Sequence, residues 1–238
     1  MKILHGILIA IFLLILADLP ARGVVAAFGS CLDTAPWWAK PVIRQGVELL
    51  IVLLAGAVIW KGEFWRFGFR FSGRLNIWKS IAISLPLFVL SVLVGGIFAG
   101  LITALFGSTP AYDFGNPNLL QRIIEIWLLA TITEEIIFRG LIQTYLSSRI
   151  TSSFSLLRLR ISHAALIAAL LFSLAHLFLL TKGAGAAQMA MIEISTFILG
   201  LAAGYFRETT GSLVPAVIIH MLFNIWGTGL QLLVTGAA

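Results

Sequence analysis

Long apolar runs separated by short polar segments set the pattern of this chain. A membrane-spanning helix needs roughly 20 apolar residues to cross the hydrocarbon core of a bilayer. Seven runs meet or approach that length, at residues 3–27, 41–60, 80–106, 119–148, 163–180, 188–206 and 213–234. The pattern therefore predicts an all-α, polytopic membrane bundle of about seven transmembrane helices.

Composition supports a membrane protein and excludes several other classes. The chain has 238 residues, of which 60% are hydrophobic and only 11% are charged, whereas soluble domains carry roughly 25% charged residues. The net charge of +6 does not indicate nucleic-acid binding, because the basic residues cluster in the short segments between apolar runs. The single cysteine, Cys31, excludes an internal disulfide framework and any cysteine-rich metal site.

Basic residues also predict an orientation. Segments 61–79, 149–162 and 207–212 hold most of the Lys and Arg residues, and they alternate with segments that hold few, at 18–40, 107–118 and 181–187. By the positive-inside rule, the N-terminus should lie in the cytoplasm and the C-terminus outside. We expect a multi-pass protein of the cytoplasmic membrane of a prokaryote.

The N-terminal half, residues 1–118, contains generic membrane helices. The first run reads as a retained helix over residues 3–27, although a signal peptide is the alternative and Asp18, Pro20 and Arg22 could end the span early. Segment 61–79 alternates aromatic residues with cations, which is typical of a chain lying on anionic lipid headgroups. These cations include Lys61, Arg66, Arg70 and Arg74. The run 80–106 exceeds the bilayer thickness and should tilt or break near its Gly95–Gly96 pair.

Ionisable side chains interrupt the apolar run 119–148 in the stretch ATITEEIIFRG, residues 130–140. Charged groups at membrane depth are costly unless they are paired or face a polar cavity, so they mark candidate functional sites. Glu135 and Arg139 are four residues apart and can pair on one helix face. Glu134 is rotated by roughly 100° and lacks that partner, which makes it a candidate general base. The alternative is that all three charges form one structural ion cluster.

Three more polar side chains should lie at the depth of Glu134. Glu134 precedes the end of its run at Ser148 by 14 residues, and His176 follows the start of its run at Ser162 by 14 residues. Both are therefore roughly 20 Å from the cytoplasmic ends of their helices. His220 and Asn224, one turn apart on the last run, fall in the same layer.

A carboxylate, two imidazoles and an amide at one depth suit a buried hydrolytic site. Glu134, His176 and His220 could alternatively bind a catalytic Zn²⁺ with one open position. His5 and His163 lie near run ends and are expected to pack. Glu193 is expected to be structural, with Arg139 or a histidine as its partner. We expect Gly200 and Gly204 to allow close helix approach.

These residues carry a resemblance to a known family. The sequence Glu134-Glu135-Ile-Ile-Phe-Arg139 resembles the EExxxR motif of the CAAX protease and bacteriocin-processing family, also called CPBP or Abi proteins. Phe172-Ser-Leu-Ala-His176 is similar to the FxxxH motif of this family, and His220-Met-Leu-Phe-Asn224 to its HxxxN motif. The resemblance covers residues 119–226, within a CPBP-like helical core over 119–238 that forms one integral membrane domain with residues 1–118.

The resemblance implies an intramembrane endopeptidase, whose eukaryotic relatives cleave the C-terminal tripeptide of prenylated CAAX proteins. It implies that Glu134 activates water with help from His176, and that His220 and Asn224 stabilise the oxyanion. Glu135 and Arg139 would support them. The family has been described both as metalloproteases and as metal-independent glutamate-type enzymes, and some members have eight spans. The expected partners are a membrane-anchored or lipidated protein or peptide and the lipid bilayer.

Two other function classes remain open at this point. A non-catalytic membrane scaffold or immunity-type protein could keep the same fold without chemistry. A proton-coupled transporter could use Glu134, Glu193 and His176 as a relay, although the chain shows no repeated halves of the kind transporters often have.

Overall fold

The computed structural model describes residues 2–71, 75–108, 111–112, 115, 117–156 and 159–235. Arg74 of the basic segment lies outside these residues. Six helices are long and apolar enough to cross a membrane. They are α1 (Lys2–Ala27), α3 (Ala39–Ile59), α4 (Ile77–Phe106), α8 (His163–Leu174) with its 3₁₀ extension η4 (Ala175–Lys182), α9 (Ala186–Thr210) and α10 (Val214–Thr235). The predicted all-α membrane bundle is thus confirmed.

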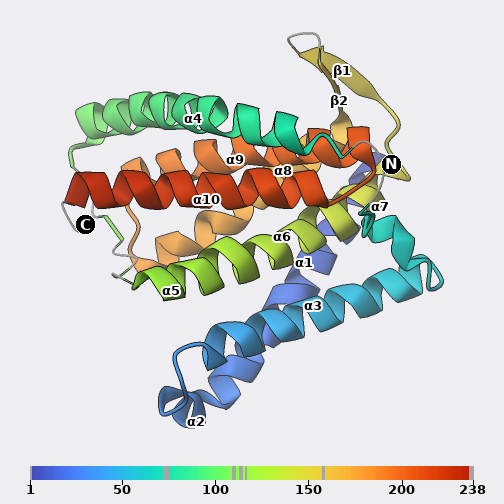
Figure 1. Cartoon of the computed structure of the whole chain (residues 1–238), viewed down its shortest axis with the longest axis horizontal. Helices are drawn as coiled ribbons and strands as arrows, with labels where there is room; N and C mark the ends of the chain where they lie inside the picture. Colours follow the sequence, from blue (N-terminus) through green and yellow to red (C-terminus); the bar gives the residue numbers. More distant parts are fainter. Residues whose placement is uncertain are drawn as a thin grey trace.

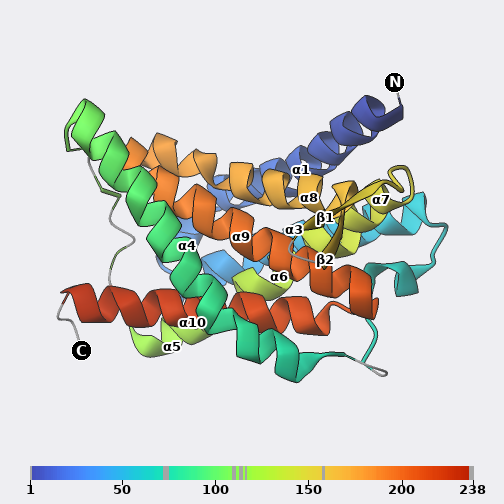
Figure 2. The same cartoon turned by 90° about the horizontal axis from the view of Figure 1, so that it is seen from above.

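The helices form two packed groups with the 119–147 run between them (Figure 1). Helix α9 lies against α4, α8 and α10, whereas α1 pairs with α3. Seen from above, α4 crosses α9 and α10 obliquely (Figure 2). A short helix α2 (Gly29–Asp33) links α1 to α3, and the segment between α3 and α4 contains one 3₁₀ turn, η1 (Phe64–Phe67).

The run 119–147 is helical throughout but changes type along its length. It consists of α5 (Leu119–Gln121), the π-helix η2 (Arg122–Ala130), α6 (Thr131–Glu135), the π-helix η3 (Ile136–Gln143) and α7 (Thr144–Ser147). A capping box between Asn118 and Gln121 starts the run. Two hydroxyls bond carbonyls five residues back, Thr131 to Ile126 and Thr144 to Arg139, each at 3.1 Å. The apolar pattern predicted a uniform α-helix, which is wrong for two-thirds of this run; π-helical turns are frequent at functional sites.

Helix α4 corrects the expectation of a break. It runs unbroken over 30 residues through the Gly95–Gly96 pair and Pro86. Gly95 instead allows contact between helices: a Cβ atom there would lie 3.2 Å from the Cα of Met191 in α9. Helix α1 likewise continues through Pro20 to Ala27, with an ion pair of 2.6 Å between Asp18 and Arg22 on its surface.

A β-hairpin, which the sequence did not predict, follows α7. Strands β1 (Ser153–Leu156) and β2 (Leu159–Ser162) pair antiparallel, with Phe154 opposite Ile161. The hairpin projects from the end of the bundle where α8 begins (Figure 1). The side chain of Ser162 then caps α8 by accepting a hydrogen bond from the backbone N–H of Ala165.

Small residues bring α8 and α9 close together beside the central run. A Cβ atom on Gly200 would lie 2.9 Å from the Cβ of Ala169, and one on Gly204 would lie 3.2 Å from the Cβ of Ala165. The predicted role of Gly200 and Gly204 in close helix approach is therefore confirmed. This contact forms one wall of the space that holds the charged side chains of the run 119–147.

Candidate active site

A buried ion pair anchors the site. The side chains of Glu135 and Arg139 are both fully buried, and Arg139 Nη1 lies 3.0 Å from Glu135 Oε1. The predicted pairing four residues apart is confirmed, even though Arg139 lies in the π-helical η3. His220 of α10, which is 3% exposed, completes the cluster with its Nδ1 at 2.7 Å from the same Glu135 oxygen. Sharing one carboxylate oxygen between a guanidinium and an imidazole offsets the cost of burying these charges.

Glu134 lies on the open side of this cluster. Its side chain is 32% exposed, and its Oε2 lies 3.7 Å from the Nε2 of His220. The imidazole of His220 therefore faces two adjacent carboxylates, one with each ring nitrogen. The distance of 3.7 Å is too long for a direct hydrogen bond, and a gap of this size between polar groups suits a bridging water.

His176 approaches from the 3₁₀ helix η4, rather than from the α-helix that the sequence predicted. Its Nδ1 lies 3.0 Å from the carbonyl oxygen of Phe172, one turn earlier. The ring of Phe172 meets His176 and His220 edge-on, with centroid distances of 5.2 and 5.5 Å. The guanidinium carbon of Arg139 lies 4.5 Å from the centre of the same ring. Phe172 thus contacts three of the predicted site residues and fixes their spacing.

Asn224 faces the central run one turn beyond His220. Its Nδ2 donates to the hydroxyl of Thr131 at 2.9 Å and to the carbonyl of Ile126 at 3.3 Å. Both acceptors lie where η2 changes to α6. The amide therefore connects α10 to the point at which the helix carrying Glu134 begins its α-helical turn.

The sequence did not single out a polar wall that α3 contributes. Gln45 and Glu48 are 4% and 6% exposed, and the Thr133 hydroxyl donates to Gln45 Oε1 at 3.3 Å. Arg44 Nε lies 3.4 Å from Glu48 Oε1, and Glu48 is within electrostatic range of Glu134. The signal was available, because three polar residues within five positions interrupt the apolar run 41–60.

Glu193 is bound to a residue that was not predicted. The hydroxyl of Ser173 in α8 donates to Glu193 Oε2 at 2.5 Å and contacts the backbone carbonyl of Glu193 at 2.8 Å. The contact is thus with a serine, and not with Arg139 or a histidine as the sequence suggested. It joins α8 to α9 one residue after Phe172.

The candidate zinc ligands do not gather into a metal site as they are arranged. No group of three or more His, Cys, Asp or Glu side chains in the described part of the chain is placed to hold a metal ion. Among the proposed ligands, the Nδ1 atoms of His176 and His220 face Phe172 O and Glu135, respectively. We therefore derive no reaction step through a metal.

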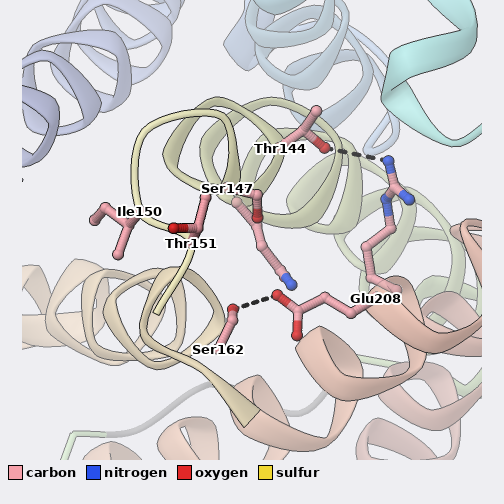
Figure 3. Close-up of a pocket in the computed structure, with 8 residues that line it drawn as sticks. Thr144, Ser147, Ile150, Thr151, Ser162 and Glu208 are labelled. Atoms are coloured by element: carbon pink, nitrogen blue, oxygen red, sulfur yellow. Dashed lines mark hydrogen bonds between the residues drawn. The ribbon is translucent and has the colours of Figure 1, made fainter. Parts of the chain in front are cut away.

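Two pockets lie outside the Glu135–Arg139–His220 cluster. The first, of about 460 Å³, is at the end of α7 (Figure 3). Its lining residues are mostly polar: Gln143, Thr144, Ser147, Ile150, Thr151, Ser162, Arg207 and Glu208. The second, of about 360 Å³, lies between α3 and η2 and is lined in part by Arg44, Gln45 and Ile126.

Comparison with known proteins assigns the segment that carries the site. Residues 116–226 match the family model described as type II CAAX prenyl endopeptidase Rce1-like, and this segment contains all three motifs. No curated protein and no solved structure matches the chain. The match supports a hydrolase of the CAAX-protease-like intramembrane endopeptidase type. The resemblance seen in the motifs is therefore confirmed, and residues 116–226 of this integral membrane protein belong to the Rce1-like family.

Proposed function

We propose that this protein hydrolyses a peptide bond of a membrane-associated protein or peptide, with Glu134 as the general base. One observation carries the proposal: Glu134 is the partly exposed carboxylate of an adjacent pair, and it faces His220 Nε2 while Glu135 holds His220 Nδ1. A base must reach water, and a helper imidazole must be held in one orientation by its other nitrogen. Both requirements are met within one turn of α6.

The reaction begins with a water between Glu134 and the scissile carbonyl. Glu134 accepts one proton as the water oxygen attacks the carbonyl carbon, which gives a tetrahedral oxyanion. The protonated Glu134 then passes this proton to the amide nitrogen as the C–N bond breaks. The products are a carboxylic acid, which ionises, and a free amine. His176, on the other side of the Phe172 ring, assists by orienting the water.

His220 is suited to stabilise the oxyanion. Arg139 favours the ionised form of Glu135, and an ionised Glu135 accepts a hydrogen bond from His220 Nδ1–H. A carboxylate in that position stabilises a protonated imidazole. The Nε2–H of that ring can then donate to negative charge developing near Glu134. Glu135 and Arg139 are thus positioning residues, which act through His220.

Asn224 is proposed as a second oxyanion donor, but it must exchange a contact to do so. Its amide nitrogen already donates to Thr131 and to the carbonyl of Ile126. The bond to Ile126 is the longer one, at 3.3 Å, and is the one we expect an oxyanion to replace. Until then, the amide holds α10 against the run 119–147.

Cleavage assays with matched carboxylate variants test the proposal. Purified protein would be incubated with a panel of membrane-anchored reporter peptides, with and without a prenylated CAAX end. Wild type would be compared with Glu134→Gln and with Glu125→Gln, a control on the same helical run. We expect cleavage by wild type and the control, and loss in Glu134→Gln. Cleavage that survives Glu134→Gln would overturn the mechanism, and a failure of wild type to cleave any reporter would favour the scaffold function.

A further inference from the structure

The segment between α3 and α4 is fastened to the site-bearing half through its backbone. Arg207 Nη2 donates to the carbonyl of Arg66 at 2.7 Å, and the backbone N–H of Leu213 donates to the carbonyl of Gly68 at 2.9 Å. Arg207 also donates to the Thr144 hydroxyl at 3.1 Å, the contact drawn at Thr144 in Figure 3. A surface loop held this way cannot move independently of α7, α9 and α10.

Phe67 is the point at which this segment enters the protein core. Its side chain is fully buried and packs edge-on against Trp60, with ring centroids 4.8 Å apart. The ring occupies space that two glycines leave free: a Cβ atom on Gly56 would lie 2.3 Å from it, and one on Gly140 would lie 2.9 Å from it. Gly140 directly follows Arg139. The segment therefore presses on η3 next to the buried ion pair.

The opposite side of the segment is exposed, aromatic and cationic. Trp65 and Phe71 are 65% and 78% exposed, and Trp78 at the start of α4 is 82% exposed. The described residues within 61–79 include four cations and one acid, a net charge of 4 − 1 = +3. They are Lys61, Arg66, Arg70, Lys79 and Glu63. We call the surface formed by Lys61, Trp65, Arg66, Arg70, Phe71, Trp78 and Lys79 the basic-aromatic surface.

This surface continues the apolar sides of the adjoining helices. Val58 near the end of α3 is 81% exposed, and Ile81 and Leu85 near the start of α4 are 39% and 46% exposed. Exposed aliphatic side chains on membrane helices face lipid tails, whereas tryptophans favour the headgroup boundary. Lys and Arg residues beside that boundary are attracted to anionic headgroups by about 1 kcal/mol each in known cases. Charge and position thus agree on a lipid occupant.

We propose that the basic-aromatic surface binds the headgroups of anionic phospholipids, and that Phe67 transmits this binding to the helix carrying Arg139 and the two glutamates. The lipid would hold segment 61–71 flat against the bilayer. Phe67 would then stay between Gly56 and Gly140 and keep η3 in place. Anionic lipid is expected to stabilise the folded protein more than zwitterionic lipid does.

Lipid-dependent unfolding tests this without any measurement of cleavage. Delipidated protein in a neutral detergent would be titrated with phosphatidylglycerol, with phosphatidylcholine, or with inorganic phosphate. Its thermal unfolding would be recorded by tryptophan fluorescence, and retained lipid by native mass spectrometry. We expect phosphatidylglycerol alone to be retained and to raise the unfolding temperature. An equal effect of phosphatidylcholine would overturn the proposal, and an equal effect of phosphate would show a free-anion site instead.

Matched variants separate charge from coupling. The double variant Arg66→Gln/Arg70→Gln should lose roughly 2–4 °C of the phosphatidylglycerol-specific rise for each cation removed. Arg66→Lys/Arg70→Lys, which keeps the charge, should retain the rise. Arg160→Gln, an exposed cation on β2, is the control and should behave as wild type. Phe67→Leu should retain lipid but show a smaller rise; a full rise in the Phe67→Leu or the glutamine double variant would contradict the proposal.

Discussion

His220 lies between two neighbouring glutamates, with Nδ1 2.7 Å from Glu135 Oε1 and Nε2 3.7 Å from Glu134 Oε2. The two carboxylates are adjacent in sequence but differ in environment: Glu135 is fully buried, whereas 32% of the Glu134 side chain is exposed. One imidazole can therefore take its orientation from the first and act beside the second. This arrangement assigns different expected outcomes to substitutions at adjacent positions.

Glu134→Gln should remove activity and leave the fold intact. The side chain keeps its size and partial exposure, so we expect the unfolding temperature to change little. Loss of a general base lowers kcat by roughly 10²–10⁴-fold. Reporter cleavage and thermal unfolding of the same preparation check this. A similar loss in the Glu125→Gln control would point to a general effect on the helix.

Glu135→Gln should destabilise the protein as well as inactivate it. Removing one partner leaves Arg139 buried and uncompensated, which costs about 3–5 kcal/mol. The double variant Glu135→Gln/Arg139→Met removes both charges, so it should be more stable than Glu135→Gln alone. Denaturant unfolding of the single and double variants measures the difference. A stable Glu135→Gln protein would mean that the pair contributes little to folding.

Gly140→Ala should be poorly tolerated because of Phe67. The added methyl group would lie 2.9 Å from the Phe67 ring, and overpacking of this kind costs about 1–3 kcal/mol. Gly96→Ala is a matched control in α4, since no atom lies within 4 Å of a Cβ built there. Combining Gly140→Ala with Phe67→Leu should restore part of the lost stability. Equal effects of the two alanines would contradict the proposed close contact.

Chelation distinguishes the two mechanisms described for the family. The arrangement of His176, His220 and Glu134 supports activation of water without a metal, so we expect cleavage to persist after a strong chelator. Loss with chelator and recovery with added Zn²⁺ would contradict this and would favour a metal site that forms only with the ion. Metal content of the purified protein is a second, independent readout.

Cysteine labelling tests the predicted orientation. Cys31 is exposed between α1 and α3, and it is the only cysteine in the sequence. In intact cells, a membrane-impermeant maleimide should label Cys31 from outside. In a Cys31→Ser background, Ser155→Cys on the β-hairpin should react only after the cells are opened. The reverse pattern would place the basic segments outside.

The sequence predicted the parts of the site that depend on helix period and span length. Glu135 and Arg139 pair as expected because side chains four residues apart share a helix face. His220 and Glu134 meet because their runs cross the same layer. The π-helical turns were missed since they arise from tertiary contacts and from hydroxyls such as Thr131, not from apolar periodicity.

Contacts made by loops and by polar residues in apolar helices were harder to foresee. Phe67 looked like one of many interfacial aromatics, and only the facing glycines explain its burial. Gln45 and Glu48 lie on a helix with no recognisable motif, so their approach to the 119–147 run depends on how α3 packs. Glu193 found Ser173 because α8 and α9 approach closely, which sequence spacing does not specify.

The sealed and open carboxylates also separate two kinds of proton exchange. Around Glu135 and Arg139 there is no exposed side-chain surface, so protons there can leave only through His220. Glu134 can exchange protons with whatever water reaches the site. The imidazole is thus the single gate between a slow interior reservoir and a fast exterior one. Hydrogen–deuterium exchange at the two nitrogens of His220 should accordingly proceed at two very different rates.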